Sequence, residues 1–352
     1  MEILILGASY GSLLSTKLLM AGHNVSLVCL PNEAELINRS GSEVRLKLRN
    51  EDTHRSLRSS DLPGKLDAVT PADADISRYD LVGLAMQEPQ YAAPEVKSLL
   101  EKIAKAGLPC LSIMNMPPLA YLNRIPALAK VDLQDCYRDA SVWQPFDPAN
   151  VTLCSPDPQA FRPPEEELNV LHVGLPTNFK AAKFEHAPHN AILNQLAADI
   201  AAVQLDGQDV PVKLRVHDSV FVPMAKWSML LTGNYRCIGK NSVQSIRDSV
   251  HGDIDASGQV YAHVDKIVQA LGGASDDAVP FEKYAKAAES LLKPSSAARA
   301  IDAGAVNIER VDRVVQTIGR ELGLNHPVVD QIVETVDGRL KENQKEQAAE
   351  PA

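Results

Sequence analysis

Short apolar runs alternate with amphipathic stretches through the first half of the chain. Residues 3–6 are an apolar run that ends at Gly7, and a segment with leucines on one stripe follows it as far as Gly22. Residues 25–30 form a second apolar run. A strand, a helix and a strand at this spacing predict a parallel sheet wrapped by helices, which is a doubly wound α/β fold.

Further runs extend this pattern to about residue 185. The additional predicted strands span 43–48, 81–85 and 110–114, and the additional helices span 33–38 and 93–105. Proline and asparagine become frequent between 131 and 185, where 168–173 is the best strand candidate and 155–164 is predicted to be a loop.

The second half of the chain is predicted to be helical. From residue 189 onward, apolar residues recur at three- and four-residue intervals. The predicted helices span 190–203, 218–235, 258–271, 280–291, 305–322 and 327–341. We therefore predict an α/β domain over residues 1–205, an all-α domain over 206–341 and a flexible tail over 342–352.

Composition and charge narrow the class of partner. Of 352 residues, 45% are hydrophobic and 23% are charged, and the net charge is −10. An acidic chain without a run of Lys and Arg argues against a nucleic-acid or anionic-membrane surface. No apolar run approaches the roughly 18 to 20 residues that cross a bilayer, and the five cysteines form no C-x-x-C pair. Without the basic start of a signal peptide, we expect a cytoplasmic protein.

The turn after the first predicted strand has the pattern of a dinucleotide site. Residues 7–12 read Gly-Ala-Ser-Tyr-Gly-Ser, and in a doubly wound fold this turn receives a pyrophosphate at a helix N-terminus. Compared with G-x-G-x-x-G the turn is one residue short, as though the middle glycine were deleted. We predict a Rossmann-like dinucleotide-binding domain, and the alternative is a tight turn that binds nothing. The predicted contacts are Gly7, Ser9, Tyr10, Gly11 and Ser12.

Two further patterns bear on this turn. The same residues spell G-x-S-x-G, but a hydrolase elbow needs strands upstream, and the turn begins at residue 7. After the second strand, an acid would favour NAD and an arginine would favour NADP. The chain has Leu30, and Glu33 either reaches a ribose or is an acid in the first helical turn. The choice between NAD and NADP stays open.

Several short segments occur in an order typical of one enzyme family. After the glycine turn they are Ala-Gly-His-Asn-Val-Ser-Leu-Val at 21–28, Leu-Ala-Met-Gln at 84–87 with Gln90, Met-Asn-Met-Pro at 114–117, Ala-Lys-Trp at 225–227 with Asn234, Ser295, Asn-Ile-Glu at 307–309 and Gly-Leu-Asn-His-Pro at 323–327. This order resembles that of the ketopantoate reductases (2-dehydropantoate 2-reductases). The resemblance covers nearly the whole chain, with an apparent insertion near 140–165. It implies a divergent member of the family.

The resemblance implies that a 2-oxo acid is reduced by hydride from NADPH. Lys226 would be the general acid that protonates and stabilises the developing alkoxide. Its segment is largely apolar, so a lysine there needs a reason beyond solvation. Asn115 would fix the nicotinamide, Asn234 and Ser295 would hold the substrate, and Glu309 would supply the acidic group.

The chain also departs from the family pattern at three contacts. Leu30 stands where the family often has an arginine, Gln87 where it has a lysine, and Asn307 where it has a glutamate. Leu30, Gln87, Gln90 and Asn115 complete the predicted cofactor contacts.

Other functions compete with this hypothesis. An opine-type imine reductase shares the architecture, and a relative that binds a small ligand or catalyses non-redox chemistry would explain the missing glycine. His186 and His189 have a spacing that two metal ligands could use, but no third ligand is evident. We predict a small-molecule substrate, no metal and, because such helical domains often pair, a homodimer.

Overall fold

The computed structural model describes residues 1–49 and 51–349. The chain divides into two compact units. The first comprises Met1–Met86, Gln90–Arg124 and Ser141–Pro223, and the second comprises Gln87–Pro89, Ile125–Ala140 and the residues from Met224 onward.

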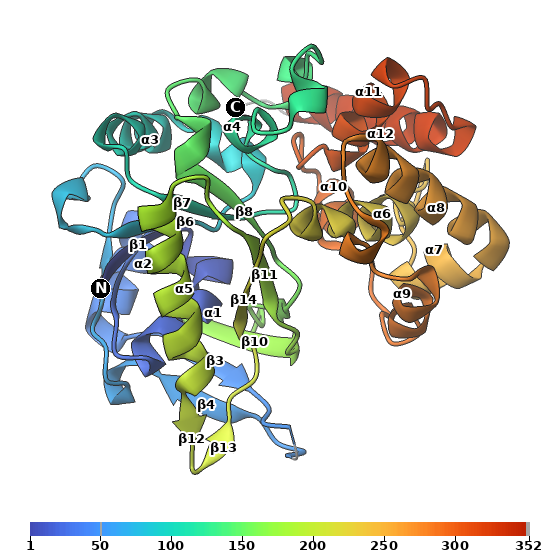
Figure 1. The fold of residues 1–352 in the computed structure, drawn as a ribbon. Coiled ribbons are helices and arrows are strands. Elements are labelled where there is room, and N and C mark those ends of the chain that lie inside the picture. The colour runs from blue at the N-terminus through green and yellow to red at the C-terminus, as the bar shows by residue number, and fades with distance from the viewer. Residues whose placement is uncertain (50, 350–352) are drawn as a thin grey trace. The chain divides into compact units, whose positions relative to one another are not determined.

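An eight-stranded sheet organises the first unit (Figure 1). Its order is β14-β11-β8-β7-β6-β1-β2-β5. From β5 to β8 all neighbours are parallel, whereas β11 is antiparallel to β8 and parallel to β14. The strands are β1 (Glu2–Leu6), β2 (Asn24–Val28), β5 (Leu66–Val69), β6 (Leu81–Leu84), β7 (Cys110–Ile113), β8 (Val151–Ser155), β11 (Phe179–Ala182) and β14 (Leu214–His217).

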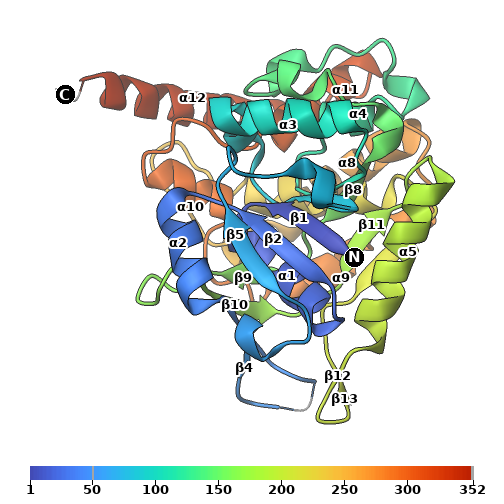
Figure 2. The ribbon, with the colours of Figure 1, turned by 90° about the vertical axis from the view of Figure 1, so that its left-hand side faces the viewer.

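This strand order confirms the predicted Rossmann-like fold. Read in chain order, the six parallel strands follow the 3-2-1-4-5-6 arrangement, and Figure 2 shows β5, β2 and β1 side by side. The direction of winding reverses between β1 and β6. In such sheets ligands bind beyond the carboxyl ends of the strands at this switch point.

Helices pack on the sheet as the apolar pattern predicts. They are α1 (Ala8–Met20), α2 (Pro31–Ser40), α3 (Pro94–Ala106), the short α4 (Leu119–Leu122) and α5 (Ala187–Ala202). Ile3 and Ile5 of β1 and Leu14 and Leu18 of α1 are buried in one apolar core. Burying one such side chain contributes about 1.5–3 kcal/mol. The packing of α1 on the sheet therefore holds the turn between β1 and α1 in place.

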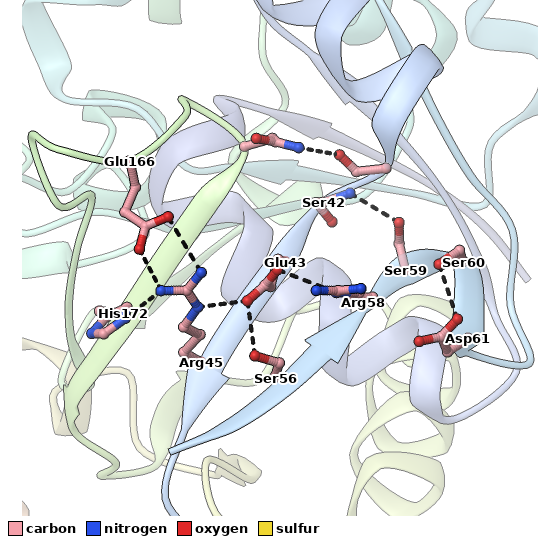
Figure 3. A network of polar contacts seen from close by, with 12 residues as sticks. Ser42, Glu43, Arg45, Ser56, Arg58, Ser59, Ser60, Asp61, Glu166 and His172 are labelled. Carbon is pink, nitrogen blue, oxygen red and sulfur yellow. Dashed lines mark hydrogen bonds and ion pairs between the residues drawn. The ribbon is translucent and has the colours of Figure 1, made fainter. Parts of the chain in front are cut away.

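A four-stranded sheet in the order β4-β3-β10-β9 completes the first unit. Its strands are β3 (Glu43–Leu46), β4 (Arg55–Arg58), β9 (Gln159–Phe161) and β10 (Val170–Leu175). The Arg45 guanidinium donates to Glu43 on its own strand and to both carboxylate oxygens of Glu166 (Figure 3). The predicted strand at 168–173 is thus found as β10. The predicted loop at 155–164 is wrong in part, because it contains β9, which pairs with β10.

A two-residue hairpin follows α5. β12 (Gln204–Leu205) pairs with β13 (Gln208–Asp209). Asp206 and Gly207 form the turn with φ of 51° and 75°, the left-handed conformation that such hairpins need. Because β14 joins the large sheet after this hairpin, the sheet extends beyond residue 205.

The second unit is built from helices, as predicted. They are α6 (Lys226–Met229), a π-helix (Leu230–Asn234), α7 (Ile246–His251), α8 (Ile254–Ala270), α9 (Phe281–Ala288), α10 (Ser296–Asp302), α11 (Val311–Glu321) and α12 (Pro327–Ala349). The predicted tail is wrong over 342–349, which continue α12, and its last three residues lie outside the described part of the chain.

The predicted helix over 305–322 is wrong in its first six residues. There the backbone leaves the helical path between α10 and α11, and the Asn343 side chain donates to the carbonyl oxygens of Ile301 and Ala305 at 2.8 and 2.9 Å. These bonds satisfy carbonyls at the end of α10 from outside the segment. Across the described residues, no helix combines the length and the apolar character needed to cross a bilayer.

Candidate active site

The glycine turn lies at the switch point of the large sheet. Gly7 links β1 to α1 with a φ of 103°, a conformation that favours glycine. A Cβ there would lie 2.6 Å from Met86 Cγ and 2.7 Å from the Ala85 carbonyl oxygen at the end of β6. At Gly11 a Cβ would lie 2.7 Å from Ile5 Cγ2, so this glycine lets α1 approach β1. These two glycines supply the tight turn and the close packing of helix on strand.

The first turn of α1 presents backbone N–H groups beyond the sheet. The intrahelical ladder begins with the Gly11 N–H, which donates to the Gly7 carbonyl at 3.2 Å. The N–H groups of Ala8, Ser9 and Tyr10 precede it at the positive end of the helix dipole. Such a terminus suits a pyrophosphate.

The side chains of the turn are placed differently from one another. Ser9 is exposed, whereas Ser12 is buried and its hydroxyl donates to the Ala8 carbonyl. The Tyr10 hydroxyl donates to the Pro158 carbonyl at 2.6 Å. Burial, with smaller contributions from Cys154 and Asp157, raises the pKa of Tyr10 well above its usual value, so this phenol stays a neutral donor.

The remaining predicted cofactor contacts follow the neighbouring parallel strands. Leu30 follows β2 and is 69% exposed. Gln90 is exposed in the turn after β6, and Asn115 is half-buried two residues after β7. Gln87, also exposed, belongs to the second unit. Leu30 and Asn115 therefore lie at the carboxyl edge of the sheet, where the turn at Gly7 also lies.

In the second unit, a π-helix changes the faces on which two predicted residues lie. Lys226 begins α6 and Asn234 ends the π-helix that follows it. In a regular α-helix a residue eight positions later is rotated by about 80° from the first. A π turn absorbs one residue and reduces this offset to about 20°. The Tyr235 N–H donates to the Leu230 carbonyl at 2.9 Å, five residues earlier, so Lys226 and Asn234 lie on one side of the helix.

The π-helix is held by a tyrosine from α9. The Tyr284 hydroxyl donates to the Met229 carbonyl at 3.1 Å. A Cβ on Gly233 would lie 2.0 Å from that hydroxyl oxygen, so only glycine leaves room for it. The predicted helix over 218–235 is wrong in two parts. Residues 218–221 are not helical and 222–225 form a 3-10 turn, and the end of the segment is a π-helix, which Tyr284 supports from about fifty positions later.

Two hydroxyl groups connect the end of the π-helix to the other predicted catalytic segments. Ser295 caps α10, accepting from the Ala298 N–H at 3.1 Å and donating to the Asn234 carbonyl at 2.7 Å. The Tyr235 hydroxyl donates to the Glu309 carbonyl at 2.5 Å and accepts from the Val311 N–H at 3.0 Å. The structure thus brings Asn234, Ser295 and Glu309 into one neighbourhood.

A second carboxyl group, Glu88, lies beside Glu309. Glu309 Oε1 accepts from the Glu88 N–H at 3.4 Å, and the buried Glu88 carboxylate accepts from the Arg138 N–H at 2.9 Å. Burial, with the nearby Glu309 charge, raises the pKa of Glu88 to about 7. A carboxyl group that titrates near neutrality can act as an acid or a base. Glu88 is not among the residues predicted from the sequence, where its only signal is its place after Gln87.

A cavity of about 290 Å³ adjoins this pair within the second unit. Glu88 and Asn307 line it, together with Arg310, whose guanidinium makes two hydrogen bonds to the buried Asp312 at 2.8 and 2.9 Å. Arg310 also pairs with Asp337 of α12 at 2.7 Å. These bonds fix the segment that carries Asn307 and Glu309 against two helices.

The histidine pair singled out from the sequence lies at the start of α5. The rings of His186 and His189 are 5.3 Å apart. Among the residues that the structure describes, no group of three or more His, Cys, Asp or Glu side chains could hold a metal ion.

Comparison with known proteins gives a fold and no sequence family. No family model and no curated protein matches the sequence. Solved structures do match along their whole length. A 2-dehydropantoate 2-reductase from Methylococcus capsulatus has a TM-score of 0.66 and 13% identity, with 100% of this chain and 99% of that chain covered. A ketopantoate reductase from Ralstonia eutropha JMP134 has a TM-score of 0.64 and 17% identity, covering 98% and 100%.

A D-mandelate dehydrogenase in complex with NADH and anilino(oxo)acetate also matches, with a TM-score of 0.64 and 14% identity. The match covers 98% of this chain and 100% of that chain. At these identities the likeness shows a shared fold. The predicted architecture, a Rossmann-like domain followed by a helical one, is therefore confirmed.

Proposed function

We propose that this protein is an NAD(P)-dependent oxidoreductase that reduces a 2-oxo acid or a related carbonyl compound. The observation that carries the proposal is the glycine turn, which lies at the switch point of a sheet with the 3-2-1-4-5-6 strand order. The solved structures of this fold include ketopantoate reductases and a dehydrogenase bound to NADH, which supports the same chemistry here.

The residues of the turn fit a dinucleotide. The N-terminus of α1 offers N–H groups to a pyrophosphate, and Gly7 and Gly11 keep the turn tight where a side chain would collide with β6 or β1. Asn115, two residues after β7, is the proposed contact for the nicotinamide end. Gln87 and Gln90 stay proposed contacts, together with Ser9, Tyr10, Ser12 and Leu30. When bound, a reduced nicotinamide supplies a hydride to the substrate carbonyl carbon.

Lys226 is the proposed general acid. As hydride transfer places negative charge on the carbonyl oxygen, the ammonium group stabilises this charge and then donates a proton to the oxygen. Asn234, turned to the same side by the π-helix, orients the substrate through its amide. Ser295 holds the backbone of Asn234, and its predicted contact with the substrate stays a prediction. Glu309, next to Glu88, is the proposed acidic group that relays protons or binds a substrate hydroxyl.

The test begins with binding and ends with turnover. Titration with NADH and NADPH, followed by fluorescence and calorimetry, is expected to give micromolar binding of at least one. A screen of 2-oxo acids then identifies a substrate, and Lys226→Ala is expected to lower kcat by about 10² to 10⁴. Lys283→Ala, which changes an exposed lysine on α9, is the matched control and is expected to keep kcat.

The other outcomes change the proposal in different ways. A folded protein that binds neither dinucleotide overturns the proposal and favours a non-redox or ligand-binding role. Turnover only when an amino acid accompanies the 2-oxo acid identifies an opine-type imine reductase. Wild-type activity in Lys226→Ala removes the lysine from the mechanism while leaving the redox function in place. Analytical ultracentrifugation tests the expected homodimer.

A further inference from the structure

The segment around β9 contacts both helices that begin at the dinucleotide edge of the sheet. The Pro158 carbonyl oxygen accepts a hydrogen bond from the hydroxyl of Tyr10, the third residue of α1. Arg162, directly after β9, donates through Nη2 to Oε1 of Glu33, the third residue of α2. The segment lies in the apparent insertion and reaches the first turns of α1 and α2 together.

Glu33 and Arg162 form a shielded ion pair at the end of β2. The side chains of Glu33 and Arg162 are 10% and 21% exposed. Both charges act on the pKa of Cys29, the first residue after β2. Burial raises the pKa of its thiol to about 12, the Glu33 carboxylate adds to that rise, and the Arg162 guanidinium opposes it. Both charged groups therefore lie at the carboxyl end of the second strand.

In doubly wound folds this place meets the ribose of the adenosine. A carboxylate here accepts hydrogen bonds from the two ribose hydroxyls, whereas an arginine binds the 2′-phosphate of NADP. The residue that directly caps α2 is Leu30, whose side chain cannot donate to a phosphate. The chain has both an acid and a guanidinium, and they are paired with each other.

We propose that Glu33, held in place by Arg162, selects the adenosine ribose and makes the protein prefer NADH to NADPH. This inference rests on the proposed dinucleotide-dependent function. Arg162 engages Oε1 of the carboxylate, and the second oxygen, Oε2, accepts from the ribose hydroxyls. The guanidinium thus acts as a positioning group for the acid.

A 2′-phosphate meets three obstacles at this position. It carries a charge of about −1.5 to −2, and the Glu33 carboxylate repels it. The guanidinium charge is already balanced by Glu33, so little attraction remains for a second anion. The N-terminus of α2 begins with Pro31, which has no N–H to offer, and Glu33 already places a negative charge in that first turn.

The experiment measures the dissociation constants of NADH and NADPH by calorimetry for the wild type and its variants. We expect wild type to bind NADH at least about tenfold more tightly than NADPH. This factor corresponds to about 1.4 kcal/mol, the size expected when the Glu33 carboxylate repels a nearby phosphate charge. Glu33→Gln is expected to lower this preference by about tenfold, mainly through tighter NADPH binding. Arg162→Met is expected to increase the preference, because the carboxylate then lacks its counter-charge.

Two variants serve as controls. Glu35→Gln changes an exposed acid on the same helix and is expected to leave the preference unchanged. Arg162→Lys keeps the positive charge and is expected to stay closer to wild type than Arg162→Met. Circular dichroism and thermal melting establish that each variant is folded.

The outcomes separate this inference from the proposed function. Wild type that binds NADPH as tightly as NADH overturns the inference and leaves the proposed function standing. An unchanged preference in folded Glu33→Gln does the same. If folded wild type binds neither dinucleotide, the proposed function fails, and the inference fails with it.

Discussion

Burial of Lys17 makes the stability of the first unit rise with pH, whereas a fully exposed lysine adds almost no pH dependence. Lys17 lies in α1 with none of its surface exposed, and its Nζ donates to the Pro211 carbonyl at 3.0 Å. Burial, with repulsion from Lys213, lowers the pKa of Lys17 from 10.5 to about 7. Above pH 7 the folded protein therefore holds a neutral amine at this position.

The sign follows from the protons bound in each state. Between pH 7 and 10.5 the unfolded chain carries a proton on Lys17 and the folded chain does not. The free energy of unfolding therefore rises with pH across this interval. At about 1.36 kcal/mol per pH unit, the full interval corresponds to about 5 kcal/mol. Relaxation of the surroundings of the charged amine lowers this, and we expect about 2–4 kcal/mol.

Lys17→Met isolates this effect, because methionine has a similar length and no charge. Urea unfolding of wild type and variant at pH 6.5, 8 and 9.5, monitored on the first unit by hydrogen exchange, gives the difference in free energy at each pH. We expect the wild type to gain stability relative to Lys17→Met by about 2 kcal/mol or more over this range. Lys102→Met, at an exposed site on α3, should show no such trend.

A direct titration provides an independent check. Lysine side-chain carbons labelled with ¹³C should report one amine, absent from Lys17→Met, that titrates near pH 7. A pH-independent difference between wild type and Lys17→Met, together with no lysine titrating below pH 9, would refute the reasoning.

Two further predictions concern the second unit. Gly233→Ala should destabilise by about 1–3 kcal/mol, because its Cβ would lie 2.0 Å from the Tyr284 hydroxyl. Adding Tyr284→Phe should recover more than half of that loss in thermal melts, since the ring carbon lies at 3.3 Å; a double variant no more stable than Gly233→Ala would contradict the proposed contact. Burial raises the pKa of Glu88 from 4.5 to about 7, so wild-type stability should fall by up to about 3 kcal/mol as pH rises through this range. Glu88→Gln should lack this fall between pH 4.5 and 7.5 in denaturant titrations, and parallel curves for both proteins would falsify that explanation.

Much of the first unit could be predicted from local pattern. The apolar runs of β1 and β2 and the leucine stripe of α1 are long enough to determine strand and helix, because each buries its own apolar face. The glycine turn was predicted for the same reason: Gly7 and Gly11 stand at fixed distances from the end of a strand. The apolar residues around Lys226 also predicted correctly that it lies on a helix.

The sequence by itself therefore determined β1, α1 and β2 and the identity of the turn between β1 and α1, since these depend on residues close together in the chain. It did not predict β5, β8, β11 and β14, which complete the large sheet. Only the tertiary structure decided the π-helix that aligns Lys226 with Asn234, because Tyr284 supports it from about fifty residues away. The pairing of Arg162 with Glu33 was likewise decided by the fold, which brings together groups 129 residues apart. Periodicity reports which face of an element is buried; it does not report which side chain from a distant element will lie against that face.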